Sequence, residues 1–139
     1  MEYKRFSDAI VVRIDRGEEI LEQVTAVAKQ ERIRLAGVEA LGATDDFTVG
    51  AFHPAEQRYQ SNRFCGDFEI VSLVGTITEK DGAPYLHLHL CAADDTGRAV
   101  GGHLNRARVS VTCEMVIRPI DGTVGRKLNP EIGINLMAF

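Results

Sequence analysis

Residues 70–92, IVSLVGTITEKDGAPYLHLHLCA, contain the pattern that decides the fold. Two stretches with the composition of β-strands, Phe68–Thr78 and Tyr85–Ala93, flank the dipeptide Asp81-Gly82. Asp-Gly is favoured in two-residue type I′ turns, because both central residues of that turn need a positive φ. The stretch is therefore predicted to form an antiparallel hairpin.

The predicted turn also sets which residues face each other. One face carries apolar residues and a glycine, in the pairs Ile77 with Leu86, Gly75 with Leu88, Leu73 with Leu90, and Val71 with Ala92. The opposite face carries Thr76 with His87, Val74 with His89, and Ser72 with Cys91. Because a slip of one residue would expose the apolar set, the hydrophobic match supports this register.

A third strand, Arg98–Leu104, is predicted to extend the same sheet. Asp95-Thr96-Gly97 suits a three-residue loop with glycine at its left-handed position, so that Asp94 faces Arg98. The apolar face then continues through Ala92 with Val100, Leu90 with Gly102, and Leu88 with Leu104. On the other face His103 stands opposite His89, with His87 two residues along.

Three imidazoles on one face of a sheet predict a metal site. Residues i and i+2 of a strand are roughly 6.5–7 Å apart and paired residues about 5 Å apart, so His87, His89 and His103 can reach one ion. Zinc, with a fourth position left to water or substrate, suits such a set. Cys91 is either a fourth ligand or a small core residue.

Two other interpretations of the histidines stay open. In the first, the histidines are polar residues that form hydrogen bonds with Thr76, Ser72 or Asn105. In the second, they line a subunit interface. Glycine inside a strand marks a bulge or a close backbone approach, and a bulge at Gly101-Gly102 would turn His103 off the shared face.

The rest of the chain predicts one α+β domain, residues 1–139, with a mostly antiparallel twisted sheet and a helix packed on one face. The helix is expected to start after Asp15, with Glu18 completing a capping box, and to run to about Gln30 on a 3.6-residue apolar repeat. Leu41-Gly42 is expected to break two strands. Further strands are predicted at Ala9–Ile14, Ile33–Ala40, Thr44–Phe52, Arg58–Phe64 and Ser110–Ile117. The apolar tail is expected to dock on its own sheet or on a neighbour.

Composition sets limits on partners and location. The net charge of −4 disfavours diffuse attraction to DNA. No apolar run is long enough to span a membrane and no signal-peptide core follows Met1, which predicts a soluble cytoplasmic protein. An odd set of three cysteines without CxxC spacing suits a reducing compartment. Cys65 and Cys113 are expected to be small buried residues.

Three motifs carry a resemblance to a known family. They are Gly66–Gly75 (GDFEIVSLVG), Leu86–His89 (LHLH) and Val100–Leu104 (VGGHL). In this order they resemble the plants-and-prokaryotes-conserved (PPC) domain family, and the similarity extends over nearly the whole chain. The resemblance implies a mixed sheet with a packed helix, assembly as a homotrimer, and a histidine-lined site that holds a metal in some prokaryotic members.

The same resemblance bears on DNA binding. Plant members carry an Arg-Gly-Arg-Pro segment before the domain, the AT-hook, which enters the minor groove of DNA. This chain has no such segment, its Gly125-Arg126-Lys127 lacks the proline, and Asp67 stands where plant members usually have arginine. The chain therefore resembles the bare prokaryotic form.

The sequence supports three functions and leaves open whether the chain is an enzyme. The first is a homotrimeric metal-binding module with a regulatory or ligand-sensing role, whose ligand is unidentified. The alternative is a zinc-dependent hydrolase or lyase, with Glu114 as the general base. The third is association with DNA through a basic patch that assembly would create from Arg106, Arg108, Arg118, Arg126 and Lys127. His53, beside Pro54, is expected to be a loop residue without a role in the site.

Overall fold

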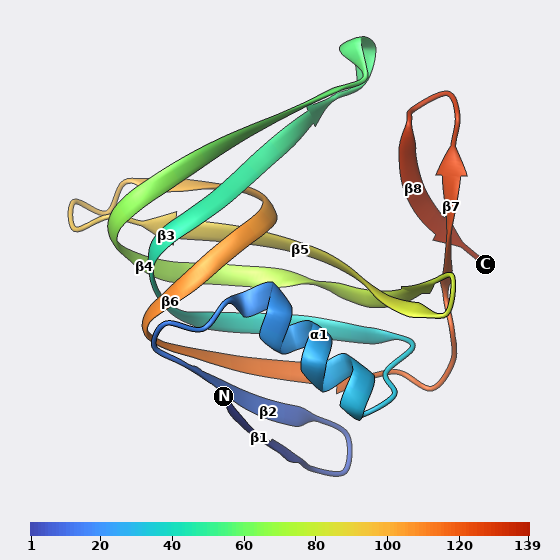
Figure 1. The fold of residues 1–139 in the computed structure, drawn as a ribbon, viewed down its shortest axis with the longest axis horizontal. Helices are drawn as coiled ribbons and strands as arrows, with labels where there is room; N and C mark the ends of the chain where they lie inside the picture. The colour runs from blue at the N-terminus through green and yellow to red at the C-terminus, as the bar shows by residue number, and fades with distance from the viewer.

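The structure, a computed structural model, describes residues 1–139 and contains one α-helix and eight strands (Figure 1). In chain order the elements are β1 (Glu2–Arg5), β2 (Ile10–Asp15), α1 (Ile20–Gln30), β3 (Ala36–His53), a 3-10 turn (Pro54–Glu56), β4 (Arg58–Lys80), β5 (Ala83–Ala93), β6 (Ala99–Pro119), β7 (Gly125–Asn129) and β8 (Ile134–Ala138).

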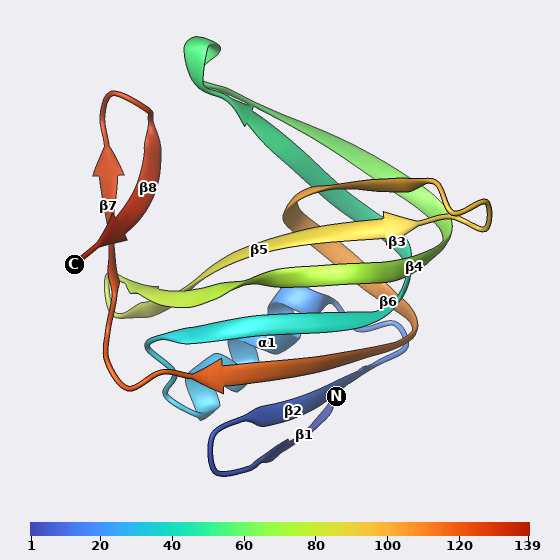
Figure 2. The ribbon, with the colours of Figure 1, turned by 180° about the vertical axis from the view of Figure 1, so that it is seen from behind.

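Six strands form one sheet in the order β1-β2-β6-β3-β4-β5, and all of their pairings are antiparallel. The last strand, β5, also pairs with β6, so the far end of the sheet folds back on a strand from its middle. Figures 1 and 2 show the cause, because β6 turns sharply between the part that faces β5 and the part that faces β2. The predicted antiparallel architecture is confirmed.

The predicted breaks between strands are wrong. Leu41-Gly42 lies inside β3, where the pairing with β4 shifts register between Ala40 and Gly42 instead of ending. Arg58–Phe64 and Phe68–Thr78 are likewise parts of β4, and the two strands predicted between residues 98 and 117 are parts of β6. Bulges let a long strand bend while most of its ladder continues, and sequence-level turn signals do not distinguish a bulge from a turn.

The helix begins later than predicted. Asp15 is the last residue of β2, and Glu19 is the N-cap of α1, with its carboxylate accepting a hydrogen bond from the Glu22 backbone N–H at 2.8 Å. The predicted contact of Glu18 with the Asp15 backbone N–H exists, at 2.8 Å, but outside the helix. The other Glu19 oxygen accepts from the Ala107 N–H at 3.0 Å and so ties the start of α1 to β6. No helix of the structure is both long and apolar enough to cross a membrane.

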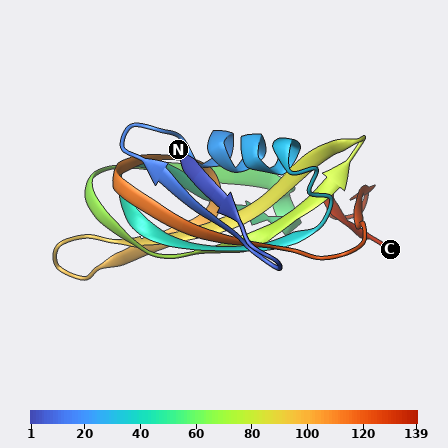
Figure 3. The same ribbon diagram turned by 90° about the horizontal axis from the view of Figure 1, so that it is seen from below.

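The apolar face of α1 contributes to the core. Ile20, Val24, Val27 and Ala28 are buried and belong to the same apolar cluster as Leu88 and Leu90 of β5. Burying an isoleucine or valine side chain stabilises the fold by about 1.5–3 kcal/mol. Figure 3 shows α1 running along one side of the sheet. Side chains of a strand alternate between the two faces of a sheet, so the residues next to Leu88 and Leu90 in β5 point to the face opposite α1.

The apolar tail forms the hairpin of β7 and β8 and lies beside the turn between β4 and β5 (Figure 1). The Glu79 backbone N–H donates to the Val124 carbonyl at 3.1 Å, and the Gln57 amide donates to the Glu131 carbonyl at 3.0 Å. The tail thus contacts its own chain but forms a separate two-stranded sheet, and its apolar side chains stay exposed. The predicted docking on a neighbour stays a prediction.

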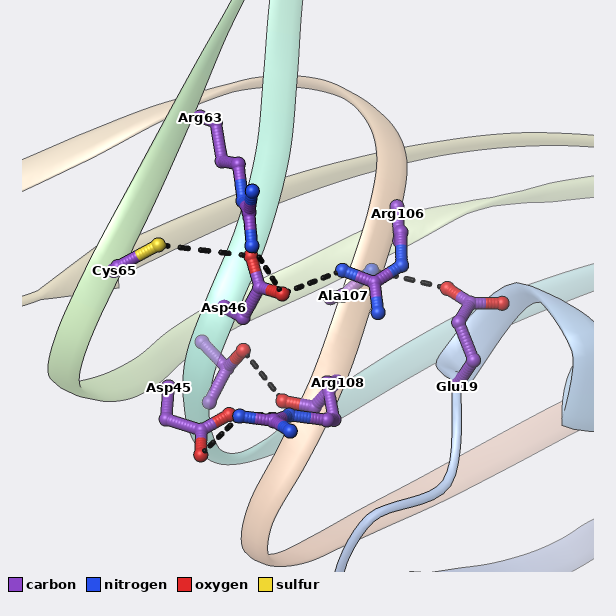
Figure 4. A network of polar contacts seen from close by, with 9 residues as sticks. Glu19, Asp45, Asp46, Arg63, Cys65, Arg106, Ala107 and Arg108 are labelled. Carbon is purple, nitrogen blue, oxygen red and sulfur yellow. Dashed lines mark hydrogen bonds and ion pairs between the residues drawn. The ribbon is translucent and has the colours of Figure 1, made fainter.

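A buried carboxylate joins the three longest strands (Figure 4). Asp46 of β3 accepts two hydrogen bonds from Arg63 of β4, at 2.8 and 3.0 Å, and one from Arg106 of β6, at 2.7 Å. These bonds hold the pKa of Asp46 well below its usual range. Asp46 lies at a register shift in both pairings of β3, so its ion pairs fasten the strands where the ladder is interrupted.

We expect Asp46→Asn to lower the free energy of unfolding by about 1–2 kcal/mol at pH 7, because charge-assisted bonds are lost but both arginines stay partly solvated. The folded-state pKa is depressed, so the stabilisation is complete above the unfolded-state pKa of about 3.9. It decreases progressively as the pH falls from there to the folded-state pKa, so part of it is lost at pH 3. Urea unfolding of the variant and the wild type at pH 7 and pH 3 measures both effects.

Asp45→Asn is the matched control. Asp45 pairs with Arg108 at 2.9 Å at a more exposed position, with a 32% exposed side chain, so its loss is expected to cost less than about 1 kcal/mol. Equal effects of the two variants at pH 7 would contradict a special role of Asp46.

Candidate metal centre

His87 and His89 of β5 and His103 of β6 converge on the face of the sheet opposite Leu88 and Leu90. His89 pairs directly with His103, and the three ring centroids are 5.2–5.5 Å apart. One nitrogen from each ring lies within 4.8 Å of the other two. The bulge that would have turned His103 away is not present.

The register predicted from the turn is confirmed around the site. Asp81 and Gly82 have φ values of 52° and 79°, as a type I′ turn requires, and β4 pairs Thr76 with His87 and Val74 with His89. Two outer pairs are wrong. A bulge sets Ile70 opposite Ala92 in place of Val71, and Leu104 pairs with Val49 of β3 in place of Leu88.

Three glycines let the backbones approach closely around the histidines. A Cβ atom on Gly75 would lie 2.1 Å from the carbonyl oxygen of His87, and one on Gly101 would lie 2.6 Å from that of Leu90. A Cβ on Gly102 would lie 2.6 Å from the carbonyl oxygen of Gly50. The Gly101-Gly102 pair therefore marks a close approach, the second of the two meanings that glycine has inside a strand.

The electrostatics of the site favour neutral imidazoles. Burial lowers the pKa of His87, and the charges of His89 and Arg126 lower it further. Burial also lowers the pKa of His103, with smaller effects from His87 and His89. Both rings are therefore neutral at pH 7, which is the form that binds a metal.

The spacing of His87 and His89 fits two ligands of a tetrahedral zinc ion. Zinc–nitrogen bonds of about 2.0–2.1 Å place two ligand nitrogens of a tetrahedron about 3.3–3.4 Å apart. The Nε2 atoms of His87 and His89 are 3.3 Å apart. Cys91 is not part of the cluster, so the chain offers three candidate ligands, one fewer than a four-coordinate zinc ion needs.

The histidines line a cavity of about 440 Å³. Its other walls are largely aromatic and apolar, with Phe52, Tyr59, Tyr85 and Ile134 among them, and no aspartate or glutamate lines it. The Tyr59 hydroxyl donates to the Asn105 side chain at 2.8 Å, and the histidine rings bond to none of Ser72, Thr76 or Asn105. No sequence signal pointed to Tyr59, because it lies in an exposed, polar part of β4.

The remaining candidate residues lie elsewhere. Glu114 is exposed and lines a separate groove with Leu41, Val71 and Val74, so one chain does not bring it to the histidines. His53 ends β3 outside the cluster. Cys113 is buried, which raises its pKa to about 12, but Cys65 is exposed and its predicted burial is wrong.

Most of the predicted basic patch is neutralised within the chain. Arg106 pairs with Asp46, Arg108 with Asp45, and Arg118 with Glu39. Arg126 differs from these three because it has no carboxylate partner.

Comparison with known proteins agrees with this description. The family model of the Plants and Prokaryotes Conserved (PCC) domain matches residues 1–121. A candidate DNA-binding protein of Bacteroides thetaiotaomicron is 28% identical, with a TM-score of 0.96 over 99% of this chain and 96% of that one. No curated protein matches.

Two archaeal structures are also similar. A metal-containing protein of Archaeoglobus fulgidus is 27% identical, with a TM-score of 0.89 over all of both chains. A plant- and prokaryote-conserved (PPC) protein of Pyrococcus horikoshii is 26% identical, with a TM-score of 0.86 over 99% of this chain and 94% of that one.

The fold and the site thus define a small antiparallel domain with three histidines grouped on one face. The chain belongs to the Plants and Prokaryotes Conserved domain family, the family that the sequence motifs resemble.

The geometry of the site predicts a specific effect of Gly75→Ala. The added methyl group would push β5 away from β4 next to His87, so we expect a loss of about 1–3 kcal/mol in the free energy of unfolding. Gly37→Ala in β3 is the control, because a Cβ atom added there would have nothing within 4 Å. Thermal unfolding of both variants checks this, and an equally stable Gly75→Ala protein would show that the close approach is dispensable.

Proposed function

We propose that the chain, as a single domain, is a homotrimeric cytoplasmic module that binds zinc through His87, His89 and His103 and senses a small ligand at the open zinc position. The observation that carries this is the grouping of three ring nitrogens within 4.8 Å of one another. The naming of a similar archaeal protein as metal-containing supports it. The three cysteines are free, which suits a reducing compartment.

Sensing is favoured over catalysis by the lining of the cavity. Bound zinc would supply Lewis acidity, and the apolar walls would limit the access of water to the fourth position. A hydrolase or lyase also needs a general base within reach of the substrate. The cavity has no carboxylate and Glu114 lines another groove, so catalysis would need a base from a second chain.

An exposed apolar face supports assembly. Leu41, Val71 and Val74 are 52–58% exposed and line one groove with Val11 and Val116. Contiguous apolar surface of this kind is typical of subunit interfaces. The proposed number of three subunits rests on the family resemblance.

Association with DNA is the weaker proposal. Its support is the naming of the similar Bacteroides protein as a candidate DNA-binding protein. Opposed to it are the net charge of −4 and the pairing of three predicted patch arginines with carboxylates.

The metal proposal is tested by elemental analysis of untagged protein purified without chelator. We expect about one zinc per chain in the wild type. In His87→Ala/His89→Ala we expect zinc affinity to fall at least about 100-fold, since loss of a ligand's supporting partner alone costs about 10–100-fold.

His53→Ala is the matched control, because it removes the one histidine that lies outside the cluster. It is expected to retain zinc. Wild-type protein that binds no added zinc, or a double variant that binds it as tightly, would refute the site.

The assembly proposal is tested by sedimentation velocity at several concentrations. We expect the mass of three 15.3 kDa chains for the wild type and a shift to monomer for Val71→Asp, which puts a charge on the exposed apolar face. Phe6→Asp, at another exposed apolar side chain, is expected to leave the mass unchanged. A wild-type monomer would contradict the proposal.

A further inference from the structure

Arg126 of β7 is unusual among the arginines of this chain. It is the one arginine that is not solvent-exposed, and it makes no ion pair with a carboxylate. Its Nε donates to the Thr78 hydroxyl at 2.8 Å, while its Nη2 is buried and has no hydrogen-bond partner. A partly buried cation without a counter-ion is costly, so the chain retains a positive charge that calls for an anion.

The position of Arg126 connects it to the histidine face. Its guanidinium lies over the ring of Tyr85, 4.8 Å from the ring centroid, and Tyr85 lines the same cavity as His87. Tyr85 and His87 are two residues apart on β5 and so point to the same side, about 6.5–7 Å apart along the strand. Thr78 is paired with Tyr85, and the next pair on that face is Thr76 with His87.

The charges around the cavity have one sign. Imidazole ligands carry no negative charge to compensate the two charges of a divalent ion, and no carboxylate lines the cavity. Arg126 is not itself a lining residue, but it lies over the ring of Tyr85, which is one, and so adds a positive charge beside the cavity. A zinc-loaded site would therefore attract an anion strongly, because opposite charges attract more in a partly dehydrated pocket than in water.

We propose that Arg126 and the metal position beside His87 form the two ends of one binding site for a small dicarboxylate. One carboxylate takes the open metal position, and the other accepts hydrogen bonds from the guanidinium, which is planar and held against Tyr85. The inference rests on the proposed function, because it uses the bound metal as one of the two ends. It assigns a ligand class to a site that the histidines alone leave undefined.

The test is calorimetric titration of zinc-loaded protein with succinate and, separately, with butyrate, which has the same chain length but one carboxylate. Wild-type protein is expected to bind succinate more tightly than butyrate. Arg126→Gln is expected to weaken succinate binding about 10-fold to 100-fold and to leave butyrate binding unchanged, since it removes one charged hydrogen-bonding partner.

Two variants and the zinc content keep the result interpretable. Lys127→Gln, which removes the neighbouring exposed cation, is expected to bind both acids as the wild type does. Arg126→Lys keeps the charge without the planar fork and is expected to fall between wild type and Arg126→Gln. Zinc content is measured first for every protein, so failure to bind zinc refutes the proposed function independently of Arg126.

Three outcomes would overturn the inference. Equal succinate affinity in wild type and Arg126→Gln would show that the guanidinium does not contact the ligand. If that variant also changed its sedimentation mass, the anion would be a carboxylate of a second copy of the chain. Equal succinate binding by zinc-loaded and zinc-free protein would show that the metal is not one of the ends.

Discussion

The pairing of β4, β5 and β6 in a single register is the constraint on which the rest of the structure depends. Side chains alternate along a strand, so the register that buries Leu88 and Leu90 also sends His87 and His89 to the opposite face. A slip of one residue would bury the imidazoles and expose the leucines. The core and the candidate metal centre are therefore two consequences of the same hydrogen-bond ladder.

Long, bent strands turn this register into a cavity. Bulges in β3 and in its partners let β6 leave β5 after His103 and cross to β3, where Leu104 pairs with Val49. Where β6 crosses to β3, the backbone hydrogen-bond ladder is interrupted by a register shift. At this point the ion pairs of Asp46 with Arg63 and Arg106 hold the strands together (Figure 4). The close glycine contacts allow the strands to meet without side chains between them.

The chemistry of the cavity follows from what surrounds the histidines. Partial burial lowers the pKa of His87 and of His103, which favours the neutral form that binds a metal. The chain places no carboxylate of its own in the cavity to act as a base or as a further ligand. The naming of a similar archaeal protein as metal-containing agrees with the proposed metal-binding role and names no substrate. The tail hairpin places Arg126, which has no carboxylate partner, over Tyr85. This positive charge is the reason for proposing that the cavity binds an anion as well as a metal.

The sequence alone determined the turn at Asp81-Gly82, the register around the histidines and the grouping of all three, because turn chemistry and period-two hydrophobicity are local properties. It did not determine the continuity of β3, β4 and β6, the start of the helix at Glu19, or the positions of Tyr59, Glu114 and Arg126 relative to the site. Those depend on which strands meet after bending and where the tail docks. Such contacts join residues far apart in the chain, and their free energies exist only once the tertiary structure has formed.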